Sequence, residues 1–84
     1  MQSQLGDVRK GKFLENVLGF GRALRRAGIP IDSSKISLAL EALTLINIDQ
    51  REECKSALFS TLIQEKHDQE VFEELFDSYF KNPD

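Results

Sequence analysis

Apolar residues recur at every third or fourth position along most of this chain, and nowhere do they alternate with polar residues as in a half-buried strand. A turn or stop signal follows each of the four segments that carry this spacing. The clearest stop comes after the first segment, because Gly28 favours the end of a helix and Pro30 cannot continue one. The pattern predicts an all-α fold, a compact bundle of about four helices.

The expected helices differ in how their apolar residues are distributed and how their ends are marked. The second has apolar residues around most of its circumference, so we expect it to be the most buried. Asp32, Ser33 and Ser34 all offer side-chain oxygens that could cap its N-terminus. Asp49 and Glu52 have the spacing of a capping box at the start of the third helix. The predicted helices cover about residues 12–27, 34–46, 49–64 and 69–81.

A chain of 84 residues has room for one small domain, since chains of this size bury only about 60% of the surface that unfolding exposes. Residues 1–11 are polar, contain two glycines and show no sustained periodicity, so we expect a flexible N-terminal arm there. A single helical domain is expected over residues 12–81. Residues 82–84 would then begin a linker or a C-terminal tail.

Charge is divided unevenly along the chain. Residues 1–35 carry seven Lys and Arg against three Asp and Glu, whereas residues 36–84 carry four against eleven. The net charge of −3 argues against a nucleic-acid partner, because phosphate binding depends on a concentrated positive surface. We expect the opposite charges of the two halves to favour internal packing or protein contacts. On the third helix, Arg51 and Lys55 are expected to face water.

The residue types that are scarce also limit the possible functions. Cys54 is the one cysteine and His67 the one histidine, so no disulfide can form within the chain and the common zinc ligand sets cannot be assembled. No apolar run approaches the ~20 residues of a membrane helix, and no signal-peptide core is evident. We therefore expect a cytoplasmic protein with no membrane partner, no metal and no cofactor, in which Cys54 is a small hydrophobe in the core.

Gly19 and Gly21 flank Phe20 in the first helix and superficially match a phosphate-binding turn. That motif requires a preceding strand, a third glycine and a helix that starts after the loop, and the sequence offers none of these. We interpret the two glycines as positions where the missing side chain lets a neighbouring helix approach, at about 1 kcal/mol each in helix propensity.

Arg22, Arg25 and Arg26 form a cationic cluster near the end of the first helix, where the helix dipole favours positive charge. One interpretation is structural, with the arginines bridging to the acidic third and fourth helices. The other is a docking patch for an acidic protein, since arginine binds carboxylates through two parallel hydrogen bonds. The adjacent apolar turn would extend such a patch, so the candidate protein-binding residues are Arg22, Arg25, Arg26, Ile29, Pro30 and Ile31.

Two further features leave alternatives open. A serine after an aspartate at the start of a second helix resembles acyl carrier proteins, although Ser34 stands where those carriers have an apolar residue after their modified serine. The aromatic residues of the last helix exceed what one helix seam needs, so part of that face could cover a neighbouring domain. These aromatic residues are Phe72, Phe76, Tyr79 and Phe80.

Three separated segments carry a resemblance to a known family. They are residues 16–31, 38–43 and 71–80, with the sequences NVLGFGRALRRAGIPI, LALEAL and VFEELFDSYF. These segments resemble the N-terminal helical region of CoxE-like proteins, which contain a von Willebrand factor A domain. The segments occur in the family's order, and the resemblance spans about residues 13–80.

The resemblance implies the N-terminal part of a longer bacterial protein, with the von Willebrand A domain downstream. Proteins similar to CoxE are associated with MoxR-type AAA+ ATPases and are implicated in metalloenzyme maturation. From this resemblance we expect a non-enzymatic protein-interaction domain whose partner is a MoxR-type ATPase or the downstream domain. The alternatives are an acyl-carrier-like protein and a structural domain that only packs on a downstream fold.

Overall fold

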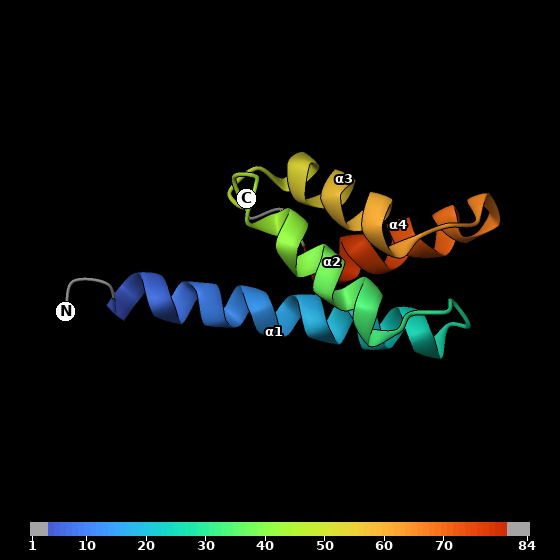
Figure 1. Ribbon diagram of the computed structural model, residues 1–84, viewed down its shortest axis with the longest axis horizontal. Helices are drawn as coiled ribbons and strands as arrows, with labels where there is room; N and C mark the ends of the chain where they lie inside the picture. Colours follow the sequence, from blue (N-terminus) through green and yellow to red (C-terminus); the bar gives the residue numbers. More distant parts are fainter. Residues whose placement is uncertain (1–3, 81–84) are drawn as a thin grey trace.

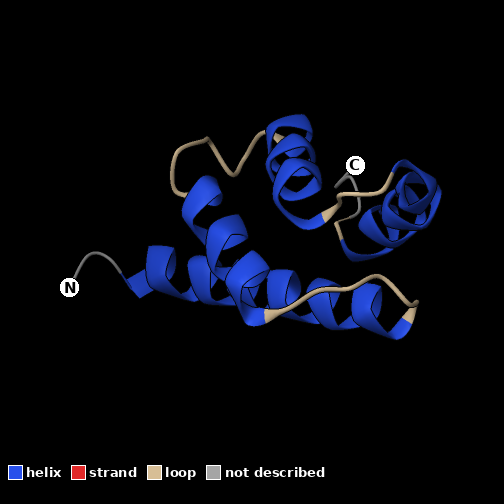
Figure 2. Cartoon of the chain, turned by 45° about the vertical axis from the view of Figure 1, so that its right-hand side comes forward, coloured by secondary structure: helices blue, strands red, loops and turns tan. Residues whose placement is uncertain are grey.

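The computed structural model describes the backbone of residues 4–80 and the side chains from Gly11 onward, and this part of the chain is helical without a strand (Figures 1 and 2). The prediction of an all-α bundle of four helices is confirmed. The elements are α1 (Gln4–Arg26), α2 (Ser33–Leu43), α3 (Arg51–Leu62), a 3₁₀ helix η1 (Lys66–Asp68) and α4 (Gln69–Tyr79).

The first helix is longer than its apolar pattern indicates. It begins at Gln4, whereas the sequence predicted a start near Lys12, so the predicted start of the helix is wrong. The flexibility of the arm expected over residues 1–11 stays a prediction. Gly6 and Gly11 each lower helix propensity by about 1 kcal/mol, but a helix that is already nucleated and packed farther along extends cooperatively. The rest of the predicted arm, residues 1–3, and the predicted tail, residues 82–84, lie outside the described residues.

The second helix is capped by the first of its three candidate residues. The backbone N–H of Lys35 donates to Oδ1 of Asp32 over 2.9 Å, which makes Asp32 the N-cap. The helix ends at Leu43, earlier than the predicted end at Ile46, and Thr44 then donates its hydroxyl to the carbonyl of Glu41. This turn leads into the loop before α3.

The loop between α2 and α3 is organised differently from the prediction. The residue before the first turn of α3 is Gln50, whose side chain makes no capping hydrogen bond, so the predicted capping box at Asp49 and Glu52 is wrong. Instead Oδ1 of Asn47 accepts the backbone N–H of Asp49 over 3.0 Å, and Glu53 accepts the backbone N–H of Asn47 over 3.3 Å. Asn47 therefore shapes the entry to α3.

The helices associate as two pairs, α1 with α4 and α2 with α3 (Figure 1). The third and fourth helices run in opposite directions, joined by η1. The end of α1, the loop before α2 and η1 lie toward one end of the molecule, at the right in Figure 1. The loop between α2 and α3 lies toward the other end.

The aromatic side chains of the last helix gather around one residue of the first. Phe20 is completely buried, and its ring lies close to four aromatic rings from α4 and the residue after it. The centroid distances are 5.4 Å to Phe72, 6.0 Å to Phe76, 6.0 Å to Tyr79 and 5.5 Å to Phe80. These rings, which the sequence suggested as a surplus, are thus largely used within the domain. The other buried apolar residues are Val17, Leu24, Ile29, Ile31, Ala39, Leu43, Cys54, Leu58, Leu62 and Ile63.

Gly19 and Gly21 lie at helix contacts, as the sequence predicted. A Cβ atom at Gly21 would lie 2.7 Å from Cδ1 of Ile36 on α2, and one at Gly19 would lie 3.3 Å from the ring of Tyr79 on α4. The missing side chains let two different helices approach α1, one at each glycine.

Two polar side chains hold the end of α4 and were not singled out by the sequence. Nε of Arg51 donates to the carbonyl of Phe80 over 2.6 Å, and Nδ2 of Asn16 donates to the carbonyl of Tyr79 over 3.0 Å. Arg51 also forms an ion pair with Asp77 and lies over the ring of Phe76. The expectation that Arg51 faces water is wrong, because its side chain is only 23% exposed. A helix C-terminus leaves carbonyls without partners, and these donors satisfy two of them.

The second helix is not the most buried one. Among its residues only Ala39 and Leu43 are buried, while Leu38 is 54% exposed. Leu45, just beyond the helix, is 83% exposed. The prediction counted apolar residues around the helix, but neighbouring elements cover only one side of it in this domain.

Candidate functional site

The candidate site begins at the turn that ends α1. Gly28 has a φ of +100°, a conformation that residues with a Cβ rarely adopt. The N–H of Gly28 donates to the carbonyl of Arg25, and that of Ile29 donates to the carbonyl of Leu24. This pair of bonds forms a Schellman motif, in which buried Ile29 packs near buried Leu24. The turn thereby reverses the chain beside the arginine cluster.

Two long cationic side chains bind the carbonyls of the loop that follows. Nε of Arg25 donates to the carbonyl of Ile31 over 3.0 Å, and Nζ of Lys35 donates to the carbonyl of Pro30 over 2.8 Å. These contacts hold the loop against α1 and leave part of the charge of both side chains at the surface. Among residues 29–31, which follow Gly28, only Pro30 is exposed.

The structure separates the candidate binding residues into two groups. Ile29 and Ile31 are 3% and 5% exposed, so their side chains belong to the core of the domain. Their contact with a partner stays a prediction. The residues on either side of Pro30 point inward because successive side chains of an extended segment alternate in direction. The residues that remain accessible are Arg22, Arg25, Arg26 and Pro30.

The arginines do not bridge to the acidic helices. Within residues 11–80, neither Arg22, Arg25 nor Arg26 forms an ion pair. The acidic residues of α4 pair with α3 instead, since Asp77 binds Arg51 at 2.7 Å and Glu73 lies 3.9 Å from Nζ of Lys55. The exposed residues Arg22, Arg25 and Arg26 together with half-buried Lys35 therefore form a positive surface, here named the cationic patch.

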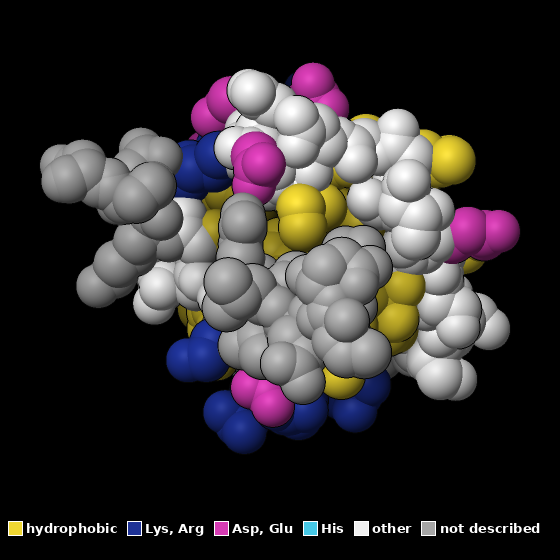
Figure 3. All heavy atoms as spheres, turned by 90° about the vertical axis from the view of Figure 1, so that its left-hand side faces the viewer, with side chains coloured by type: hydrophobic (Ala, Val, Ile, Leu, Met, Phe, Trp, Pro, Cys, Tyr) yellow, Lys and Arg dark blue, Asp and Glu magenta, His cyan; other side chains and the backbone are white. Residues whose placement is uncertain are grey.

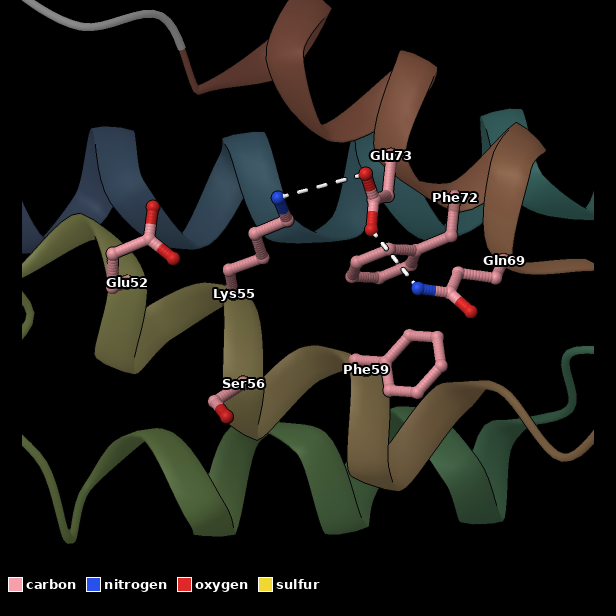
Figure 4. A pocket seen from close by; sticks show the side chains of 7 residues that line it. All are labelled: Glu52, Lys55, Ser56, Phe59, Gln69, Phe72 and Glu73. Carbon is pink, nitrogen blue, oxygen red and sulfur yellow. Dashed lines mark hydrogen bonds and ion pairs between the residues drawn. The ribbon is translucent and has the colours of Figure 1, made fainter. Parts of the chain in front are cut away.

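A small polar pocket of about 180 Å³ lies between α3 and α4 (Figure 4). Lys55 and Glu73 point toward each other across it, and Nε2 of Gln69 donates to the second carboxylate oxygen of Glu73 over 3.2 Å. The rings of Phe59 and Phe72 form the apolar part of its lining. Because the charged groups pair with one another, we interpret this pocket as a contact between helices.

An apolar groove lies near the other end of the molecule, and the sequence analysis missed it. It measures about 550 Å³ and is formed by α1, the end of α2 and the loop before α3. Hydrophobic side chains are visible at the surface of this end, beside the undescribed residues (Figure 3). The one signal in the sequence was the excess of apolar residues on α2 and the following loop. The lining residues are Phe13, Leu14, Leu40, Leu43, Thr44, Ile46, Asn47 and Ile48.

The remaining candidates are ordinary surface or core residues by their positions. Ser33 and Ser34 are exposed in the first turn of α2, and His67 is exposed in η1, where Nε2 lies 3.4 Å from Oδ1 of Asp68. Cys54 is buried as predicted, and its thiol donates to the carbonyl of Ile48 over 3.5 Å. Burial raises the pKa of this thiol, and the nearby carboxylates add to the rise, so little reactive thiolate forms.

The described part of the chain lacks a metal-binding cluster and a membrane-spanning helix. No three His, Cys, Asp or Glu side chains come together there in a way that could hold a metal ion. None of the described helices combines the length and apolar character needed to cross a membrane.

Comparison with known proteins supplies the family. Curated proteins and solved structures give no significant match to this chain. Residues 17–83 match the family described as the CoxE N-terminal helical bundle domain. The match covers the second half of α1, all the later helices and the cationic patch, and the observed fold is a helical bundle as that description states. The chain therefore belongs to the CoxE N-terminal helical bundle domain family.

Proposed function

We propose that this domain is a non-enzymatic protein-interaction domain of a CoxE-like von Willebrand A protein, and that it binds a MoxR-type AAA+ ATPase during metalloenzyme maturation. A bacterial, cytoplasmic setting belongs to the same proposal. The observation that carries it is the cationic patch, whose arginines are exposed and form no ion pair within the described chain. Membership of the CoxE family makes the ATPase the first partner to test.

The electrostatics of the patch favour an acidic protein surface as the ligand. Arg22 and Arg26 lie four residues apart and so on one face of α1, with Arg25 beside them. Arginine forks bind carboxylates through two hydrogen bonds, and complementary charge speeds the encounter of two proteins. The interaction should therefore weaken as the salt concentration rises, because the patch is at the surface.

The test reverses two charges and leaves the loop intact. Arg25 is excluded because its side chain holds the carbonyl of Ile31, so a change there would also disturb the turn. The variant is Arg22→Glu with Arg26→Glu, whose side chains make no hydrogen bond within the described chain. The matched control is Lys12→Glu with Lys66→Glu, which alters the net charge equally at two exposed positions that are not part of the patch. Lys12 lies farther back along α1, and Lys66 lies in η1 at the same end of the molecule as the patch.

Binding of the full-length protein to the ATPase is measured by calorimetry or interferometry for both variants. We expect the patch variant to bind about tenfold or more weakly and the control to bind within about threefold of the wild type. Equal affinities of the two variants would remove the patch from the interface. Circular dichroism of both variants shows whether the helices are retained.

A further inference from the structure

We propose that the apolar groove binds an apolar segment of the polypeptide that follows residue 84 in the full-length protein. The proposal rests on family membership and on the groove, and it does not use the cationic patch. Six of the eight described lining residues are large and apolar, and none of these eight is charged. Leu14 is 43% exposed at its edge, so the groove is suited to apolar side chains.

The size of the groove argues for a tethered occupant. A stable interface between separate proteins involves about 20–30 residues on each side. Eight of the described residues line the groove, so a contact confined to them would be smaller than a typical interface between separate proteins. A segment joined to the domain by a short linker is present at an effective concentration in the millimolar range, so a small apolar contact is sufficient.

The path of the chain places such a segment nearby. Phe80, the last described residue, follows α4, and its ring centroid lies 6.0 Å from that of Phe13. Phe13 itself lines the groove. The described part of the chain therefore ends next to a residue that lines the groove. The family is an N-terminal domain by its description, so in proteins of this family further polypeptide follows the bundle.

The test compares the accessibility of paired positions in the full-length protein. Leu14→Cys and Thr44→Cys place a thiol in the lining of the groove, whereas Leu38→Cys and Ser37→Cys place one on exposed residues of α2 outside it. Leu14 and Leu38 are 43% and 54% exposed in the bundle, so an open groove predicts similar reaction rates. Each variant reacts with N-ethylmaleimide, and the modified position is read by peptide mass spectrometry.

We expect both groove thiols to react about tenfold or more slowly than both outside thiols, independently of protein concentration. A smaller difference would overturn the proposal, and so would a natural polypeptide that ends at residue 84. Protection that disappears after about hundredfold dilution would assign the groove to a second copy, which also overturns it. Thr44→Cys keeps the test decisive if Leu14→Cys fails to fold. Loss of ATPase binding in the patch variant is a separate result, so the two proposals fail independently.

Discussion

The second and fourth helices have the same length, eleven residues, but they use their apolar side chains differently. α4 turns one face to the core and buries Phe72 and Phe76 completely, and its other face is polar and acidic. α2 carries leucines on more than one face, buries Ala39 and Leu43, and leaves Leu38 exposed.

The difference shows how a small domain divides its apolar surface between stability and contact. In α4, the apolar face is covered within the bundle by stacked and edge-to-face contacts between aromatic rings. α2, here named the two-sided helix because its apolar residues lie on more than one face, cannot be enclosed by a chain of this size. Too few other elements are available to cover it. Its remaining apolar residues either stay at the surface, as Leu38 does, or line the groove, as Leu40 does.

The largest effect that separates the two helices is expected from core truncation. Phe76→Ala should lower the free energy of unfolding by about 3–5 kcal/mol, because it removes a fully buried ring and leaves a cavity. Leu38→Ala should change it by less than about 0.5 kcal/mol, because that side chain is already half in water. Urea unfolding followed by circular dichroism measures both. If Phe76→Ala is too unstable to fold, Phe76→Leu should show the same direction with a smaller loss.

Similar losses of unfolding free energy from Leu38→Ala and Phe76→Ala would contradict the difference drawn between α2 and α4. They would mean that Leu38 is covered in solution, and α2 would then have to be reassigned to the core.

The fold class followed from spacing alone, because periodicity and stop signals are local properties of the chain. Gly28 and Pro30 marked the end of α1 correctly, and the roles of Gly19 and Gly21 could be inferred because a glycine inside a helix costs stability that packing must offset. The start of α1 was misjudged because helix extension depends on cooperativity with packed residues farther along.

The candidate site was predictable only in part. The arginines were found as a cluster, but the burial of Ile29 and Ile31 depends on which way the loop faces, and that is a tertiary property. Arg51 read as a solvated charge because its partners, Asp77 and the carbonyl of Phe80, are more than twenty residues away in the sequence. The groove was missed for the same reason, since it forms only where α1, α2 and the loop meet.

A smaller effect is expected from removing the contacts of Arg51 at the end of α4. Arg51→Ala should lower the free energy of unfolding by about 1–3 kcal/mol, because it removes the 2.6 Å hydrogen bond to the carbonyl of Phe80 and the packing on Phe76. Lys55→Ala is the matched control, with nearly equal exposure, 25% against 23%. Its contacts with Glu73 and Phe76 are longer, at 3.9 and 5.9 Å, so the loss should stay below about 1 kcal/mol.

Salt sharpens this prediction. Asp77 is 67% exposed, so its ion pair with Arg51 contributes little, and the loss from Arg51→Ala should change little when salt is added. A loss that salt abolishes would show that the ion pair, and not the hydrogen bond, holds α4.

The smallest effect concerns how closely α2 approaches α1. Gly11→Ala should raise the free energy of unfolding by about 0.5–1 kcal/mol, because a Cβ at Gly11 meets no atom within 4 Å and alanine favours the helix. Gly21→Ala should not give this stabilisation. It should be neutral or destabilising by about 1 kcal/mol, because its Cβ would lie 2.7 Å from Cδ1 of Ile36.

In an Ile36→Ala background, Gly21→Ala should stabilise as much as Gly11→Ala does. The resulting coupling energy between positions 21 and 36, about 1 kcal/mol, is measured by a double-mutant cycle of urea unfolding. A coupling near zero would mean that α2 does not rest on Gly21, and the placement of the two-sided helix against α1 would be wrong.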